Sequence, residues 1–291
     1  MPGSRVALIA PAGPLRDETD LQHALDATRS MGWEPVVGNH VLERDGYLAG
    51  RDEHRLADLN RFATDRSIDG IWCIRGGYGT MRLLDQLDYH AWFRRPKVLI
   101  GYSDITALHS ALNVRAELVS YHGPTARGEL TPFSRASLRA AVIEGSESCG
   151  AAPTAVTLCS GRARGRLIGG NLALLAALCG TRYAPSFADA ILVIEDVNEA
   201  VYRVDRMLTQ LRLSGALHHL AGIAFGHFTD IPDCPPNETR SMMELLNEFA
   251  QRMAVPCLAN IPVGHISDQW TMPLGAIAEL DADSKILSVG R

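Results

Sequence analysis

The stretch KVLIGYSDITALHSAL, residues 97–112, joins an apolar strand to a helix and decides the fold of the first half of the chain. Residues 98–100 form a short apolar run, which is typical of a strand that is covered on both faces. Ile105, Leu108 and Leu112 then recur at i, i+3 and i+7, which is the spacing of one face of a helix. The stretch therefore predicts a buried strand followed directly by a helix.

Ser103 stands at the join of this strand and helix, and two interpretations of it are open. A serine that precedes a helix is commonly its N-cap. A nucleophilic serine can instead occupy a sharp strand-to-helix turn, whose usual signature is G-x-S-x-G. Here Gly101 is present but Ile105 replaces the second glycine. Taken alone, the segment favours the cap.

The same alternation of strand and helix runs through residues 1–146. Expected strands are Val6–Ala10, EPVVG (34–38), GIWCIRGGYG (70–79) and ELVSYHGP (117–124), and expected helices cover 18–31, the region of Leu56, Leu59 and Phe62, and TMRLLDQL (80–87). Strands that alternate with helices indicate a parallel sheet in an α/β domain. Ligands of such sheets bind at the carboxyl ends of the strands, where both RGGYG and GYSD lie.

Residues 147–161 are small, polar and glycine-containing, which predicts a linker between two domains. The following residues, 162–291, are predicted to form a smaller, β-rich domain of α+β type. Its expected strands are GRLIGG, AILVIED, GIAFGHF, GAIAELDAD and KILSVG, and its expected helices lie near 171–179, 201–213 and 239–252.

Composition excludes several classes of partner. The chain has a formal net charge of −5, so it has no basic field to attract a nucleic acid. The arginine-rich segment 162–166 lacks the interleaved aromatic residues of a nucleic-acid site and is predicted to be a solvated strand edge. The apolar run at 6–10 is shorter than the core of a signal peptide, and no run approaches the length of a membrane span. We therefore expect a cytoplasmic protein without a nucleic-acid or membrane partner.

The cysteines and histidines show no metal-binding pattern. No C-x-x-C or H-E-x-x-H motif occurs, so we expect no metal and no cofactor. Six cysteines without paired spacing are expected to be free thiols: Cys73, Cys149, Cys159, Cys179, Cys234 and Cys257.

A nucleophilic serine requires a base, and a third group must orient that base. Glu195 directly extends the apolar run at 191–194, and a carboxylate at such a buried position needs a partner to stay ionised. Asp196, beside it, or Glu199 is explained more simply as a group that complements the N-terminus of the helix expected from about residue 201. The candidate bases are four histidines that the residues alone do not rank: His109, His122, His227 and His265.

The segment IRGGYGT, residues 74–80, is a glycine-rich turn between a strand and a helix. Arg82 stands where a dinucleotide fingerprint needs its third glycine, and no G-K-[ST] follows, so neither nucleotide motif is present. The glycines either permit a tight turn with positive φ or allow close approach of the backbone to another group.

These motifs, in this order and over nearly the full chain, resemble the LD-carboxypeptidase family of serine peptidases, also called muramoyltetrapeptide carboxypeptidases. The blocks that carry the resemblance are LIAPAGP, RGGYG…RLLDQLD, LIGYSDITALH, HGP, GGNLALLAALCGT, ILVIEDVNEAVYRVDRMLTQL and VGH…TMPLGAIAELD.

The resemblance implies a catalytic triad of Ser103, Glu195 and His265. It also implies an oxyanion hole formed by the backbone N–H of Asp104 and by one from the RGGYG turn, Gly77 or Gly76. In this family the serine lies in a G-[YH]-S-D pattern, so the second glycine of the usual elbow is not expected. The implied fold is a flavodoxin-like N-terminal domain with a smaller β-rich C-terminal domain, assembled as a homodimer.

The implied activity is release of the terminal D-alanine from the meso-diaminopimelate of a murein tetrapeptide. An exopeptidase must also bind a terminal carboxylate, for which an arginine fork is suited; Arg75 and Arg203 lie beside the motifs and are the candidates. Two alternatives remain: a related carboxypeptidase that confers self-immunity to a nucleotide-peptide antibiotic, and a non-catalytic peptide-binding protein. Short connections and a 6% aromatic content favour the murein peptide over a nucleotide conjugate.

Overall fold

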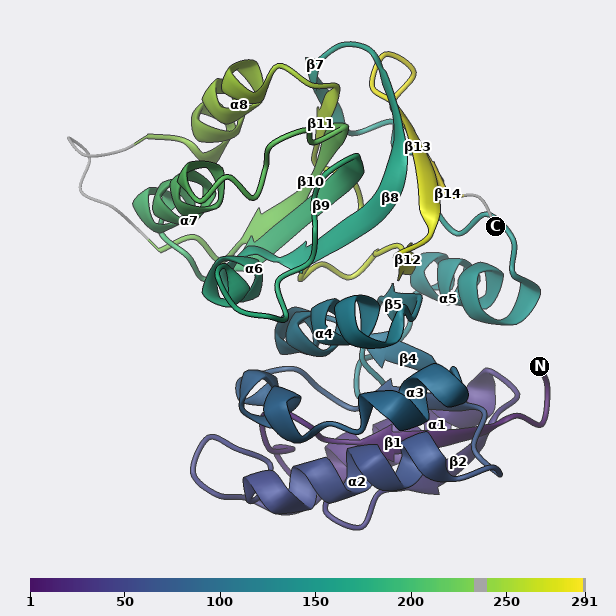
Figure 1. The fold of residues 1–291 in the computed structure, drawn as a ribbon. Helices are drawn as coiled ribbons and strands as arrows, with labels where there is room; N and C mark the ends of the chain where they lie inside the picture. The colour runs from purple at the N-terminus through teal and green to yellow at the C-terminus, as the bar shows by residue number, and fades with distance from the viewer. Residues whose placement is uncertain (233–239, 290–291) are drawn as a thin grey trace.

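The computed structural model describes residues 1–232 and 240–289, which form two α/β domains (Figure 1). Cys234, expected as a free thiol, and the first residue of the helix expected at 239–252 lie outside the described residues. In the described part of the chain, no helix is long and apolar enough to cross a membrane.

The N-terminal domain is built on a six-stranded sheet in the order β12-β5-β4-β3-β1-β2. Its parallel strands are β1 (Arg5–Ile9), β2 (Glu34–Val37), β3 (Gly70–Cys73), β4 (Val98–Gly101) and β5 (Ser120–His122). The order of these five strands, 2-1-3-4-5, is that of flavodoxin-like folds. The predicted parallel α/β domain is therefore confirmed.

Helices cover both faces of this sheet because successive side chains of a strand point to opposite sides. Ala7 and Ile9 face one core with α2 and α4, whereas Val6 and Leu8 face a second core with α1. The helical segments are α1 (Glu18–Ser30), α2 (Asp52–Thr64), η1 (Thr80–Gln86), α3 (Tyr89–Arg94), η2 (Ser103–Ile105), α4 (Thr106–Ala116), α5 (Pro132–Arg139) and η3 (Ala140–Glu144).

The C-terminal domain is built on an eight-stranded mixed sheet in the order β6-β14-β13-β8-β9-β10-β11-β7. Its strands are β6 (Gly150–Ala151), β7 (Val156–Cys159), β8 (Arg162–Asn171), β9 (Ala190–Val197), β10 (Gly222–Thr229), β11 (Cys257–Ala259), β13 (Ile277–Asp281) and β14 (Ile286–Val289); its helices are α6 (Leu172–Leu178), α7 (Val201–Leu213) and α8 (Met242–Met253). Strands β8 to β11 are parallel to one another, and the outer strands are antiparallel.

Alternation along β9 determines which way Glu195 points. Leu192 and Ile194 pack in the core that includes residues of α6, α7 and α8, whereas Ile191 and Val193 pack on the opposite face. Glu195 continues the second set, so its side chain lies on the face that is also lined by the residues flanking His265.

Residues 147–161, predicted to be a linker, contribute two strands to the C-terminal sheet. β6 pairs with β14, and β7 pairs with β11 at the other edge. Small and polar residues are tolerated there because both are edge strands, so local composition resembles that of a loop.

The two domains also share a strand. β12 (Met272–Leu274) pairs antiparallel with β5, and Met272 lies opposite His122. In Figure 1, β5 lies directly below β12, and α4 lies to its left where the two domains meet. This pairing brings the segment that contains His265 to the carboxyl edge of the N-terminal sheet.

Candidate active site

Ser103 occupies a strained turn at the carboxyl end of β4. Its φ angle is +64°, a left-handed conformation that a residue with a Cβ seldom adopts. Neither η2 nor α4 has a side-chain cap, so Ser103 does not serve as an N-cap. A serine held in this conformation without a capping role is the arrangement expected of a strand-to-helix elbow.

Gly76 lies directly against Ser103. A Cβ added at Gly76 would stand 2.9 Å from Ser103 Cβ, 3.2 Å from Ser103 Oγ and 3.2 Å from the Tyr102 carbonyl oxygen. Gly77, the next residue, has a φ of +120°. The glycine-rich turn therefore meets both needs considered from the sequence: close approach at Gly76 and positive φ at Gly77.

Replacing Gly76 by alanine is expected to displace Ser103 and to lower kcat/KM by about 10²-fold, since a shift of about 1 Å in a reacting group has such an effect. Gly46→Ala is the control, because Gly46 also has positive φ (+57°) but has open space around it. That variant should lose about 1 kcal/mol of stability and keep its activity. Steady-state kinetics and urea unfolding of both variants check this; equal activity in the two would contradict it.

Hydrogen bonds of Asp104 link the glycine-rich turn at residues 74–80 to the turn that carries Ser103. Oδ2 of Asp104 accepts a hydrogen bond from the Thr80 N–H (2.8 Å), and its carbonyl oxygen accepts one from Thr80 Oγ1 (2.6 Å). Burial raises the pKa of Asp104, and the hydrogen bonds oppose that shift. The backbone N–H of Asp104 lies in the first turn of η2, where amides have no intrahelical partner. In the described residues the amides of Gly76 and Gly77 likewise donate to no protein acceptor.

Glu195 and His265 are in direct contact. His265 Nδ1 lies 2.8 Å from Glu195 Oε2, and Glu195 is fully buried. Two glycines make room for the carboxylate: a Cβ at Gly264 or at Gly226 would stand 3.2 Å from Glu195 Cβ. The neighbouring Asp196 accepts a hydrogen bond from the Ala173 N–H in the first turn of α6, so it complements that helix N-terminus and not the one expected near residue 201.

Tyr102 connects this pair to Ser103, and sequence reasoning missed it. Its ring lies 4.8 Å from the His265 ring, centroid to centroid, and Ser103 is the next residue along the chain. Burial raises the pKa of Tyr102, and the charge of Glu195 raises it further. The G-Y-S-D motif is a signal for this role, since it places an aromatic residue directly before the serine.

The other candidate histidines have different surroundings. His109 is buried on α4, with its ring nitrogens 2.8 Å from Ser120 Oγ and 2.9 Å from the Gly101 carbonyl oxygen. His122 is fully buried beside Tyr102, and neither ring nitrogen has a partner among the described residues. Of the four, His265 is the one that contacts Glu195.

The two arginines proposed for a terminal carboxylate lie in different environments. Arg75 is partly buried in the glycine-rich turn, and its Nη1 donates to the Pro14 carbonyl oxygen at 2.5 Å. The side chain of Arg203 is 56% exposed on α7, beside Tyr202 and Glu199.

One group of side chains in the described residues has the composition of a metal site: His40, Glu43 and His54, whose candidate ligand atoms lie within 4.8 Å of one another. Each histidine Nδ1 lies 2.7 Å from a different oxygen of Glu43. Sequence reasoning missed the group because His54 belongs to α2 and the other two residues to the preceding loop.

Comparison with known proteins identifies the family of the chain. Residues 6–123 match the family model described as LD-carboxypeptidase N-terminal domain, and residues 164–280 match the LD-carboxypeptidase C-terminal domain. The chain belongs to the LD-carboxypeptidase family. The resemblance inferred from the motifs is thus confirmed.

Family members that are similar over their full length include a putative carboxypeptidase of Streptomyces coelicolor, 42% identical over 100% of this chain and 94% of that protein. The murein tetrapeptide carboxypeptidase of Pseudomonas aeruginosa is 37% identical over 96% of this chain and 94% of its own. A solved structure of muramoyltetrapeptide carboxypeptidase from Oxalobacter formigenes superposes with a TM-score of 0.86, at 31% identity over 99% of both chains. A more distant relative, the microcin C7 self-immunity protein of Escherichia coli, is 26% identical over 89% of this chain and 84% of that protein.

Proposed function

We propose that this member of the family is an LD-carboxypeptidase that hydrolyses the bond between meso-diaminopimelate and the terminal D-alanine of murein tetrapeptides. The observation that carries the proposal is the 2.8 Å contact between His265 and the buried carboxylate of Glu195, with the His265 ring 4.8 Å from that of Tyr102, the residue before Ser103. Relatives named as murein peptide carboxypeptidases, at 33% and 37% identity, support the substrate.

In the proposed reaction, Ser103 Oγ attacks the carbonyl carbon of the scissile bond while His265 Nε2 takes the hydroxyl proton. His265 then donates this proton to the leaving amine, D-alanine departs, and an ester between Ser103 and the remaining tripeptide is left. Water, deprotonated by His265, hydrolyses the ester and regenerates Ser103. Glu195 holds the imidazole in the required tautomer and stabilises its protonated form.

The amides of Asp104 and of Gly76 or Gly77 are proposed to stabilise the oxyanion. Each such donor contributes roughly 3 kcal/mol to transition-state stabilisation. The hydrogen bonds between Asp104 and Thr80 support this assignment, because they fix the turn that carries Gly76 relative to the turn that carries Ser103.

Replacing Glu195 by glutamine tests the proposed role of the carboxylate. The amide preserves size but not charge, so kcat for D-alanine release should fall by about 10²- to 10⁴-fold with little change in KM. Glu279→Gln is the matched control, because Glu279 is exposed and pairs with Arg164 on the sheet surface. Loss of less than threefold in the Glu195 variant would contradict the role.

Two further properties are proposed, the location of the protein and its oligomeric state. The described cysteines, Cys73, Cys149, Cys159, Cys179 and Cys257, are free thiols, as expected in a reducing compartment, which supports a cytoplasmic location. A homodimer is expected from the family resemblance, and sedimentation analysis would test it.

The self-immunity activity is the second candidate function, since the microcin C7 relative also spans most of the chain. The higher identity to the murein enzyme favours the peptide substrate. A non-catalytic binding protein is the third, and it predicts that a fluorophosphonate probe leaves Ser103 unlabelled while murein peptide still binds.

A further inference from the structure

Four arginines of the N-terminal domain, Arg16, Arg44, Arg75 and Arg127, lie near one another, and two of them pair with the buried carboxylate of Asp20; we call the four the arginine cluster. Asp20, 1% exposed, lies 2.7 Å from Arg16 Nη2 and 3.6 Å from Arg127 Nη1. Arg75 donates to the Pro14 carbonyl oxygen, and Arg44 donates to that of Leu15 at 2.6 Å.

Topology explains why residues so far apart in sequence meet. Arg16, Arg44, Arg75 and Arg127 follow β1, β2, β3 and β5, respectively, and Ser103 follows β4. The carboxyl ends of parallel strands lie at one edge of a sheet, so the arginines and the serine share that edge. Because β4 lies between β3 and β5, the loops carrying Arg75 and Arg127 flank Ser103.

Positive charge exceeds negative charge in this region. The charges that act on Arg75 include one carboxylate, that of Asp20, and three guanidinium groups, those of Arg127, Arg16 and Arg44. The hydrogen bonds from Arg16 hold the pKa of Asp20 at about 2, so Asp20 stays ionised. Burial lowers the pKa of Arg75, and the charges of Arg127, Arg16 and Arg44 lower it further.

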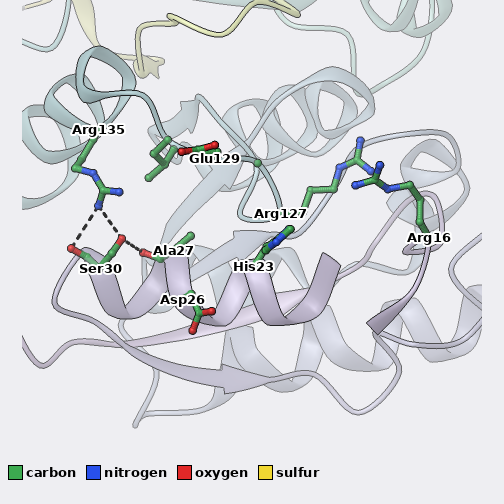
Figure 2. A pocket seen from close by; sticks show the side chains of 10 residues that line it. Arg16, His23, Asp26, Ala27, Ser30, Arg127, Glu129 and Arg135 are labelled. Carbon is green, nitrogen blue, oxygen red and sulfur yellow. Dashed lines mark hydrogen bonds between the residues drawn. The ribbon is translucent and has the colours of Figure 1, made fainter. Parts of the chain in front are cut away.

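Two members of the arginine cluster, Arg16 and Arg127, line a cavity of about 610 Å³ that runs along α1 (Figure 2). Arg16 and Arg127 point toward each other at one end, and Arg135 lies at the other, where its Nη1 donates to Ser30 Oγ at 2.7 Å. Asp26 on the wall pairs with Arg29. Glu129 is the second carboxylate on the wall, and the two guanidinium groups of Arg16 and Arg127 lie together at one end.

Arg127 connects the cavity to the candidate active site. Its N–H donates to the Ile74 carbonyl oxygen (3.2 Å), two residues before Gly76. Its side chain is also near enough for its charge to act on Tyr102, the residue before Ser103.

We propose that the arginine cluster, chiefly through Arg127 and Arg16, binds a free carboxylate of the peptide substrate while the scissile bond lies at Ser103. This inference rests on the proposed function. Arg127 and Arg16 present guanidinium groups to one space, and guanidinium groups bind carboxylates through paired hydrogen bonds. The cavity along α1 accommodates the adjoining part of the ligand. Arg75, chosen from the sequence, is thus one member of a larger site, and Arg203 has no part in it.

Binding to the Ser103→Ala protein tests the site without turnover. The probes are murein tetrapeptide, its C-terminal amide, and the tetrapeptide with its glutamate carboxylate amidated, each measured by calorimetry. Arg127→Ala is expected to raise the Kd of the tetrapeptide about 10- to 100-fold, the range for loss of a charge-assisted hydrogen bond. The amidated analogue that lacks the bound carboxylate should bind the Ser103→Ala protein as weakly as the tetrapeptide binds the Arg127→Ala variant. Arg127→Ala should not weaken the binding of that analogue further. The result therefore identifies which carboxylate is bound.

Further variants separate recognition of the carboxylate by the arginine cluster from the general effect of removing a positive charge. Arg127→Lys should recover only part of the affinity, because an ammonium lacks the fork. Arg16→Ala, whose side chain is 69% exposed, should weaken binding by a smaller factor. Arg182→Ala is the control, since Arg182 pairs with Asp85 and Tyr183 outside the arginine cluster, and it should leave Kd unchanged.

Three outcomes are decisive. If the wild type hydrolyses the tetrapeptide but Arg127→Ala changes neither Kd nor KM, the inference is overturned and the proposed function stands. If all three ligands lose affinity equally in the Arg127 variant, carboxylate recognition is likewise overturned. If the wild type neither binds nor hydrolyses tetrapeptide, the proposed function fails, and the peptide as ligand of the arginine cluster fails with it.

Discussion

Replacing Ser103 by alanine is expected to lower kcat for D-alanine release by roughly 10⁴-fold or more, because covalent catalysis is lost and only binding and oxyanion stabilisation remain. The residue has no capping role whose loss would unfold the helix, so the variant should stay folded. Chromatographic detection of D-alanine and tripeptide, with circular dichroism of the same samples, measures both quantities.

Ser103→Gly separates catalysis from backbone strain. It should be as inactive as the alanine variant yet more stable than it by about 1 kcal/mol, because glycine adopts the φ of +64° without a Cβ clash. A Ser103→Ala protein with more than a tenth of wild-type activity would exclude Ser103 as the nucleophile. Equal stability of the alanine and glycine variants would contradict the strained turn.

A second large effect is expected at acid pH, where the free energy of unfolding should fall. Burial lowers the pKa of His109 to about 4 and that of His122 to about 3, so both are neutral in the folded protein. In the unfolded chain each takes up a proton below about pH 6.5. Their contribution to stability is therefore intact above that pH and is lost as the pH falls, by about 1.4 kcal/mol per unit for each histidine. At pH 5 the two together should remove roughly 4 kcal/mol.

The effect of one histidine is isolated with His122→Leu, which removes a buried group whose ring nitrogens have no partner in the described residues. Two carboxylates act in the opposite sense: burial raises the pKa of Asp104, and it raises the pKa of Asp196 to about 6. The contributions of these two carboxylates to the pH dependence are the same in the variant and in the wild type, so they cancel in the comparison. Between pH 7.5 and pH 5, urea unfolding should show a loss about 2 kcal/mol smaller in the variant.

His23→Gln, at an exposed position of α1, should follow the wild-type curve. An identical pH dependence in the His122 variant and the wild type would show that His122 is not held neutral by burial.

Periodicity and strand-end position predicted much of this molecule. The apolar run before Ser103 and the helical spacing after it are local signals, and so is the acidic residue that extends the buried strand β9. The family motifs then added the pairing of Glu195 with His265, which no local signal contains, since the two residues are 70 positions apart. Gly226 and Gly264 leave the space that the Glu195 side chain occupies, and this relation is visible only in the folded structure.

The features that could not be predicted from the sequence depend on contacts between residues that are far apart in the chain. β6 and β7 look like linker because a short edge strand is defined by the strand it pairs with and not by its own composition. Of the arginine cluster, the sequence indicated Arg75 alone, because the other three arginines are ordinary loop residues and only the parallel order of the strands brings their loops together. Likewise, the positive φ of Ser103 follows from packing against Gly76 and from the anchoring of Asp104, not from its own sequence window.

The most direct test of the proposed function is a side-by-side assay of the wild-type protein with murein tetrapeptide and with an aspartyl-nucleotide conjugate, followed by mass spectrometry. The account predicts release of D-alanine and tripeptide, a kcat/KM for the tetrapeptide at least about 10²-fold above that for the conjugate, and no product from either substrate with Ser103→Ala. Cleavage of the conjugate alone, or release of D-alanine that survives loss of Ser103, would contradict it.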